Sequence, residues 1–187
     1  MSVTDHCGPR LARRAFCASV VALAGAPMLA LPKRVAASAS VRALAFQNTH
    51  TGEALALPYA RGGTLLPDAL RAFDNFLRDF RTGESHPIDP ALFDQLHTLA
   101  AITGTRQPFQ VISGYRSPAT NQALREHGGG GVAQRSLHLE GRAIDIRLTD
   151  IGLADLRDAA LSLKAGGVGY YAQSAFVHID TGRIRRW

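Results

Sequence analysis

The feature that most constrains this chain is a short strand pattern that follows a histidine-bearing loop. In the segment 143–148, small or polar side chains alternate with isoleucine and leucine, so one face is apolar and Asp145 lies on the other. The apolar face can enter a core, which holds Asp145 on a rigid element. His138 lies shortly upstream. Because a neutral imidazole and a carboxylate are both ligands of catalytic zinc, this stretch predicts part of a metal site.

A second strand pattern, near the end of the sequence, offers a third ligand. In 176–180 the alternation puts His178 and Asp180 on the same strand face. Two imidazoles and one carboxylate leave a fourth position on zinc for water, and zinc lowers the pKa of that water, as amide hydrolysis requires. The alternative is that two histidines and an aspartate occur in one domain by chance. The sequence has no HExxH helix, which would have been a more specific sign of a zinc site.

Such a site also needs a general base near the water. Asp180 is the first candidate because it shares a strand face with His178, and the alternative is that its carboxylate orients that imidazole. Glu140, two residues after His138 in an expected loop, is a weaker candidate. Arg116, between a strand end and a helix start, is expected to bind a substrate carboxylate or stabilise an oxyanion, with a surface ion pair as the alternative.

Residues 40–187 are predicted to form one domain of the α+β class. The glycine run at 128–131 is not a phosphate loop, because no Gly-Lys-Ser/Thr follows it, and we expect it to let a loop move at the rim of the site. Hydrophobic periodicity and turn residues predict strands at 41–46, 54–57, 108–113, 143–148, 168–171 and 176–180, and helices at 67–81, 90–103, 119–127 and 151–164.

Residues 1–39 are predicted to be an export signal. Arg13-Arg14 resembles a twin-arginine signal, 15–31 is mildly apolar, and 37–39 form an A-x-A-like cleavage site. A disordered basic tail is the alternative. Because the apolar run is short and contains glycine and proline, we expect no membrane anchor and a soluble product in the periplasm or another exported compartment.

The charge distribution argues against nucleic-acid binding. Of the 21 basic and 15 acidic residues, five basic and one acidic lie in 1–39, so 40–187 carries 16 basic against 14 acidic residues. The high pI is therefore largely a property of the leader. Both cysteines, Cys7 and Cys17, also lie there, so the domain after cleavage has neither disulfides nor thiolate ligands.

Five segments spread along the chain resemble those of a known enzyme family. The pattern Ser136-x-His138-x-x-Gly141-x-Ala143-x-Asp145 is similar to the first zinc motif of the LAS peptidases: lysostaphin-type enzymes, D-Ala-D-Ala peptidases and hedgehog-like domains. The run Ser-Gly-Tyr-Arg-Ser at 113–117 resembles the arginine-bearing motif of the D-Ala-D-Ala branch. The segments 44–59, 166–171 and 176–182 look like the YcbK-like (MepK) murein endopeptidases, exported zinc enzymes that cut peptide cross-links in peptidoglycan.

This resemblance implies a central antiparallel sheet with flanking helices, a LAS/hedgehog-like fold. The zinc ligands it implies are His138, Asp145 and His178. The substrate-side arginine it implies is Arg116, and we expect Ser136 and Tyr115, which lie within these motifs, to bind substrate as well. One departure concerns the base: VanX-like relatives place a glutamate three residues before the last histidine, where this chain has Ala175. The base must then come from elsewhere, which favours Asp180.

Three functions are compatible with these patterns. The leading hypothesis is a monomeric, exported, zinc-dependent endopeptidase whose partner is peptidoglycan. A carboxypeptidase that trims stem peptides is the first alternative, and it would need a cleft closed at one end. A wall-binding domain that keeps the ligands but lacks the base is the second. The sequence does not select the cross-link, although the activity characterised in the family is on bonds between two diaminopimelate residues.

Overall fold

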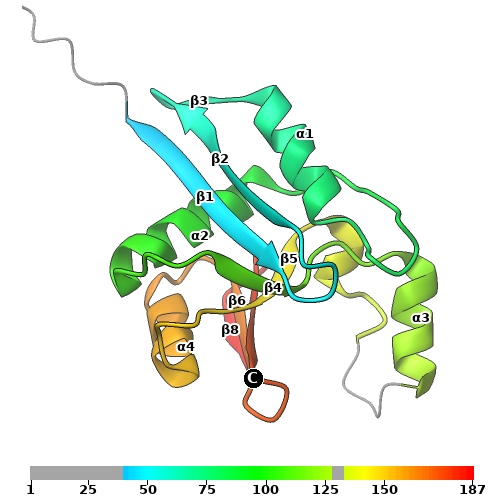
Figure 1. Cartoon of the computed structure of the whole chain (residues 1–187). Coiled ribbons are helices and arrows are strands. Elements are labelled where there is room, and N and C mark those ends of the chain that lie inside the picture. Colours follow the sequence, from blue (N-terminus) through cyan, green and yellow to red (C-terminus); the bar gives the residue numbers. More distant parts are fainter. Residues whose placement is uncertain (1–39, 128–132) are drawn as a thin grey trace, which may run out of the picture. The chain divides into compact units, whose positions relative to one another are not determined.

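A computed structural model describes residues 40–127 and 133–187 (Figure 1). Within these residues, one sheet contains eight strands in the order β3-β2-β1-β4-β5-β7-β6-β8. The strands are β1 (Val41–Asn48), β2 (Ala54–Arg61), β3 (Thr64–Leu65), β4 (Phe109–Ser113), β5 (Ala143–Arg147), β6 (Gly167–Tyr171), β7 (Phe176–Asp180) and β8 (Arg185–Arg186). The helices are α1 (Pro67–Phe76), α2 (Pro90–Thr103), α3 (Pro118–His127), α4 (Leu153–Ser162) and a short 3-10 helix, η1 (Leu137–Glu140).

Most neighbouring strands are antiparallel, which confirms the α+β class with a central antiparallel sheet and flanking helices. Two pairs are parallel instead, β1 with β4 and β6 with β8. A parallel pair needs a crossover connection, and between β1 and β4 the chain passes through β2, β3, α1 and α2. The sheet is therefore mixed at these two places, a detail that strand periodicity does not reveal.

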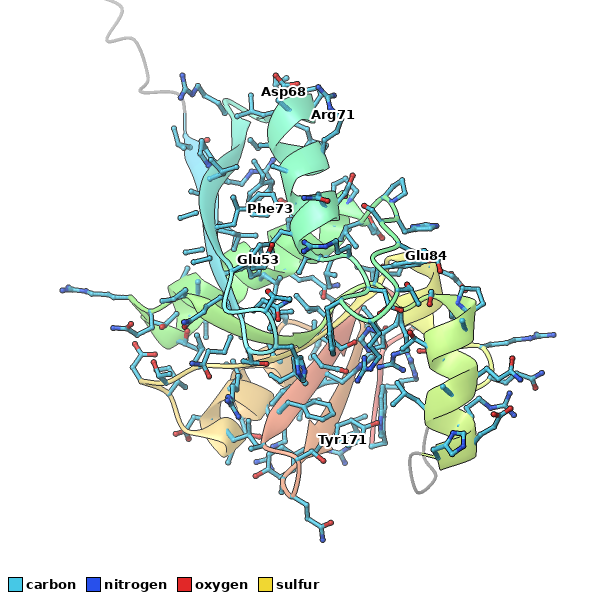
Figure 2. The ribbon with its side chains drawn as sticks, turned by 45° about the vertical axis from the view of Figure 1, so that its right-hand side comes forward. Glu53, Asp68, Arg71, Phe73, Glu84 and Tyr171 are labelled. Atoms are coloured by element: carbon cyan, nitrogen blue, oxygen red, sulfur yellow. The ribbon has the colours of Figure 1, made fainter. Side chains whose placement is uncertain are left out.

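The apolar core lies between the sheet and its helices. Helix α1 contacts β2, α2 contacts β1 and α4, and α4 contacts β6 and β7. Phe73 of α1, labelled in Figure 2, packs edge-on against Phe46 of β1 with 5.5 Å between ring centroids. The predicted stripe on α2 is buried, with Leu92, Leu96 and Leu99 closed to solvent. This packing anchors the strands that carry the site.

Helix α2 begins and ends as the sequence predicts. The Asp89 carboxylate accepts a hydrogen bond from the Ala91 N–H at 2.9 Å, and Gly104 ends the helix with φ 67°. Helix α4 is shorter than the expected 151–164, because its first and last predicted residues lie in the flanking turns.

The expectation of a helix over 67–81 is wrong at its end, since α1 stops at Phe76. The buried Asp79 explains the stop. Its carboxylate accepts hydrogen bonds from the backbone N–H groups of Arg81 at 3.0 Å and Ser117 at 2.9 Å. These bonds turn the chain away from the helix axis and attach it to the loop that follows β4.

Strand register brings the predicted site residues together. Strand β5 lies between β4 and β7, and Asp145 is opposite Ser113 on one side and His178 on the other. Ala143 is likewise opposite Asp180. Because directly opposite residues of antiparallel strands have Cβ atoms about 4.5–5.5 Å apart, pairing by itself places two predicted ligands in contact.

All described residues belong to one compact unit. None of the helices in this part of the chain is long and apolar enough to cross a membrane. The predicted export signal, 1–39, and the glycine run, 128–131, lie outside the described residues.

Candidate metal centre

Three buried side chains bring their donor atoms together. Nδ1 of His178 lies 2.8 Å from Oδ1 of Asp145, and Nε2 of His138 lies 3.3 Å from that oxygen and 3.2 Å from Nδ1 of His178. Ligands about 2.0–2.1 Å from a tetrahedral zinc ion are about 3.3 Å apart, so this spacing suits such an ion. Across 40–127 and 133–187, these residues form the only group of three such side chains close enough to hold a metal.

Hydrogen bonds on the far side of each imidazole determine which nitrogen faces the other donors. Nδ1 of His138 lies 2.7 Å from the carbonyl oxygen of Gly114, which can only accept, so this nitrogen carries the proton. Nε2 of His178 lies 3.2 Å from Oδ2 of Asp180, which places a proton there by the same reasoning. In the neutral rings, the remaining nitrogens and Oδ1 of Asp145 face one another with lone pairs only. Such a donor set repels itself without a cation, and it therefore fits a divalent metal.

Burial and neighbouring charges act in opposite directions on the pKa values of this group. Burial raises the pKa of Asp145, but the charges and hydrogen bonds of His138 and His178 outweigh it and hold that pKa well below its ordinary value. Burial lowers the pKa of His178, but hydrogen bonds to Asp145 and Asp180 outweigh it and raise that pKa. Because a metal ligand must give up its proton, metal binding at His178 competes with protonation.

The short turn that carries His138 has a defined start and a defined end. Helix η1 starts after Ser136, whose carbonyl oxygen accepts the Leu139 N–H at 3.0 Å, and it ends at Gly141 with φ 64°. The carbonyl oxygen of His138 accepts the Arg116 N–H at 3.1 Å. A backbone hydrogen bond therefore links the motif that contains Arg116 directly to the motif that contains His138.

Arg116 lies beside the metal ligands with 11% of its side chain exposed. Its Nη2 is 3.6 Å from Oδ2 of Asp145, its Nη1 donates to Oδ1 of Asn121 at 3.4 Å, and its Nε has no hydrogen-bond partner in the described part of the chain. Burial lowers the pKa of Arg116, against the opposing effect of the Asp145 charge. Nε is closed to solvent, but the Arg116 side chain also lines the pocket over the metal donors, where a guanidinium can bind an anion or a polarised carbonyl oxygen.

The Asp180 carboxylate is enclosed by donors and has no exposed side-chain surface. Its Oδ1 accepts the N–H groups of Gly167 at 3.0 Å and Gly182 at 2.8 Å. Arg185 donates to both oxygens, at 3.1 and 2.7 Å. Burial alone would raise the pKa of Asp180, but hydrogen bonds from His178, Arg185 and the two amides hold it well below its ordinary value. Such a carboxylate neither reaches water nor readily accepts a proton.

The other acid considered as a base, Glu140, points to the surface. Its carboxylate lies 3.2 Å from the Arg142 guanidinium, and 53% of its side chain is exposed. Among the described residues that line the pocket over the metal donors, Asp145 is the only carboxylate. Neither Glu140 nor Asp180 faces that pocket.

The pocket itself has a volume of about 410 Å³ and is lined by Arg116 and Ser136 as well as the three donors. Tyr115 does not line it. The ring of Tyr115 stacks on His86 with 4.9 Å between ring centroids, and its N–H donates to the Leu77 carbonyl on that side of the loop. Of the three residues expected on the substrate side, Arg116 and Ser136 thus line this pocket, whereas Tyr115 packs on His86.

An aromatic wall of this pocket was not predicted from the sequence. The Trp187 ring lies 5.3 Å from the His178 ring, and its Nε1 donates to the Tyr171 hydroxyl at 2.8 Å. Tyr171, labelled in Figure 2, ends β6, whereas Trp187 follows β8. No local spacing relates these two residues, so no sequence pattern pointed to them.

A buried His–Asp–His donor set inside a pocket, with an arginine beside it on an α+β sheet, defines a metallopeptidase with a single-metal centre. The family described as "Peptidoglycan L,D-endopeptidase MepK" matches residues 36–187. The chain belongs to this family, as its motifs predicted.

Two relatives show how close the similarity is. Peptidoglycan L,D-endopeptidase MepK of Escherichia coli K12 is 47% identical over 146 residues, which cover 78% of this chain and 80% of the relative. Probable peptidoglycan L,D-endopeptidase MepK of Haemophilus influenzae is 40% identical over 161 residues, covering 84% of this chain and 86% of the relative. No solved structure gave a significant match.

Proposed function

We propose that this protein is an exported, zinc-dependent endopeptidase that hydrolyses peptide cross-links in peptidoglycan. The observation that carries the proposal is the convergence of three buried donors at 2.8–3.3 Å inside a pocket. The names of the relatives, peptidoglycan L,D-endopeptidases, support the substrate and the type of bond.

His138, Asp145 and His178 would hold the metal. Two imidazole nitrogens and one carboxylate oxygen form a ligand set that zinc takes in catalytic sites with a fourth position open. A zinc ion held there supplies Lewis acidity toward water and a peptide carbonyl. The protein contributes the fixed direction of each donor, through the Gly114 carbonyl on one imidazole and Asp180 on the other.

Arg116 acts on the substrate side of the site. Its place in the pocket lining and its position beside Asp145 support binding of a substrate carboxylate or of the oxygen that gains charge during hydrolysis. Ser136, which lines the same pocket, assists in substrate binding through its hydroxyl.

Asp180 orients His178 and does not act as the general base. A base must come within hydrogen-bond reach of water, and the Asp180 oxygens are already occupied by Arg185, two backbone amides and His178. Of the two roles that the strand pattern allowed for this carboxylate, its surroundings support the orienting one.

Residues 1–39 direct export by the twin-arginine route, supported by Arg13-Arg14 and the small residues at 37–39. The mature enzyme then works in the periplasm as a monomer, without membrane insertion and without nucleic acid. A substrate that forms the cell wall supports this location.

The test combines metal content with product analysis. The purified protein is assayed for bound zinc and incubated with isolated sacculi, with and without a chelator, and the muropeptides are resolved by chromatography and mass spectrometry. We expect about one zinc per chain and a chelator-sensitive loss of cross-linked dimers. Trimmed stem peptides with intact dimers would identify a carboxypeptidase instead, and zinc binding without any fragments would identify a wall-binding domain.

A further inference from the structure

Arg185 of β8 makes a two-point contact with a residue that touches a metal ligand. Its Nη1 donates to Oδ1 of Asp180 at 3.1 Å, and its Nη2 donates to Oδ2 at 2.7 Å. Oδ2 is also the atom that faces Nε2 of His178 at 3.2 Å. The Arg185 guanidinium therefore fixes the rotation of the Asp180 carboxylate. That carboxylate in turn determines which ring nitrogen of His178 carries the proton.

The backbone on β6 is shaped to admit this contact. Strand β8 pairs in parallel with β6, with Arg185 opposite Gly167. A Cβ atom at Gly167 would lie 2.5 Å from Nη1 of Arg185 and 2.5 Å from Oδ2 of Asp180. Only glycine leaves room at this position for the guanidinium and the carboxylate to meet.

Trp187 covers the same group from the pocket side. The Arg185 guanidinium carbon lies 4.8 Å from the centre of the Trp187 ring, and that ring lies 5.3 Å from the His178 ring. A Cβ at Gly169 would lie 2.7 Å from the indole, so a second glycine of β6 makes room for this ring. Arg185 is thus held between a buried carboxylate and an aromatic face.

We infer that Arg185 is a positioning residue of the metal centre, which acts through Asp180 to keep Nδ1 of His178 directed at the metal. This inference rests on the proposed metal site. Arg185 extends the hydrogen-bonded pair of His178 and Asp180 by a third residue. The short strand β8 thereby has a role in holding the metal centre. Partners that orient a ligand in this way typically change metal affinity by about 10–100-fold when they are removed.

The neighbouring Arg186 provides a matched control. It lies on the same strand and carries the same charge, and its side chain has no hydrogen bond or ion pair in the structure of 40–127 and 133–187. Because successive strand residues point to opposite faces, Arg186 is directed away from Asp180. Arg185→Met and Arg186→Met therefore remove equal charge from the same strand.

The experiment measures zinc affinity by competition with a chelator in the full-length protein. We expect Arg185→Met to bind zinc about 10–100-fold more weakly and Arg185→Lys to recover part of the loss, because lysine keeps the charge but not the two-point contact. Arg186→Met is expected to match the wild type within about twofold, since the control touches no orienting partner.

A double-mutant cycle with Asp180→Ala tests whether Arg185 acts through that carboxylate. If it does, Arg185→Met adds little further loss of zinc affinity in the Asp180→Ala background. Asp180→Asn replaces this variant if the alanine protein does not fold. Equal losses in the two backgrounds, or wild-type affinity in Arg185→Met, would overturn the inference.

The imidazole N–H proton of His178 gives a readout independent of activity. In the zinc-loaded wild type, we expect a slowly exchanging Nε2–H signal by nuclear magnetic resonance, with faster exchange in Arg185→Met and no change in Arg186→Met. A wild type without bound zinc would contradict the proposed metal site itself. A zinc-loaded wild type with an unaffected Arg185→Met signal would contradict only the role of Arg185.

Discussion

The carbonyl oxygen of Gly114 accepts a hydrogen bond from Nδ1 of His138 over 2.7 Å, although the two residues belong to different motifs. The bond holds the proton on Nδ1 and leaves Nε2 free for a metal. It also ties the loop that carries Arg116 to the turn that carries the ligand. A Cβ at Gly114 would lie 2.5 Å from the carbonyl oxygen of Leu77, so this loop has no room for a side chain at that position.

Gly114→Ala is therefore expected to displace the loop and weaken metal binding. We expect a loss of about tenfold or more in zinc affinity, because the carbonyl that orients His138 moves. Overpacking is expected to lower the free energy of unfolding by about 1–3 kcal/mol. Chelator competition and urea unfolding of the metal-free protein measure the two effects.

Gly83→Ala is the control for this variant. Gly83 has φ 78° and open space around its Cβ position, so alanine there brings backbone strain of about 1–2 kcal/mol without a clash. Its zinc affinity is expected to equal that of the wild type. Equal zinc loss in both variants would show that the bond between Gly114 and His138 does not matter to the metal.

Removing the metal is expected to lower thermal stability. In the metal-free protein, the donors of His138, Asp145 and His178 face one another without a cation. Zinc at 100 times its dissociation constant is expected to add about 2.7 kcal/mol of stability. Asp145→Asn replaces the anionic ligand by a neutral amide, so zinc is expected to add far less stability to this variant. Thermal unfolding with zinc and with chelator measures both proteins, and a wild-type midpoint indifferent to zinc would refute the metal site.

Arg116→Met is expected to separate turnover from metal binding. Arg116 contacts Asp145 only at 3.6 Å, so the variant is expected to keep its zinc. The loss of a donor to the reacting oxygen is expected to reduce kcat by about 10²–10³-fold. Arg116→Lys restores the charge without the planar fork and is expected to recover only part of the rate. Kinetics on cross-linked muropeptides and metal analysis test this, and zinc loss in Arg116→Met would mean that the arginine supports the ligands instead.

Acid is expected to weaken the loop that carries Arg116. Burial raises the pKa of Asp79, but hydrogen bonds from Thr120, Ser117 and the Arg81 backbone outweigh it and lower that pKa below its unfolded value. The stabilisation is therefore present above the unfolded pKa, about 3.9, and is lost as the pH falls through the folded pKa.

Asp79→Asn tests this pH dependence. At pH 7 it is expected to be less stable than the wild type by about 1–3 kcal/mol, because a buried N–H loses its acceptor. The difference is expected to shrink as the pH falls from about 5 to 3. Urea unfolding across this range measures it, and parallel stability curves for the two proteins would rule out Asp79 as the titrating group.

The side-chain period of a strand explains why the candidate ligands were visible in local patterns. Alternation along 143–148 and 176–180 correctly put Asp145 and His178 on the faces they occupy, because the side-chain period of a strand is set by its backbone. The motif around His138 was likewise visible because it lies within one turn of chain. The helix over 67–81 was predicted too long because a buried contact from Asp79 to a distant loop overrides local periodicity.

By itself, the sequence determined the family and the α+β class and pointed to the three candidate metal ligands, since each of these depends on motifs and periodicities that are local in the chain. The tertiary structure decided what surrounds them. Asp180 is saturated by Arg185, Tyr115 stacks on His86, and the Trp187 ring lies beside that of His178, all through contacts that strand and helix periodicity do not encode. Local periodicity sets which face a side chain occupies, but only the tertiary packing of the chain sets which partners meet it there.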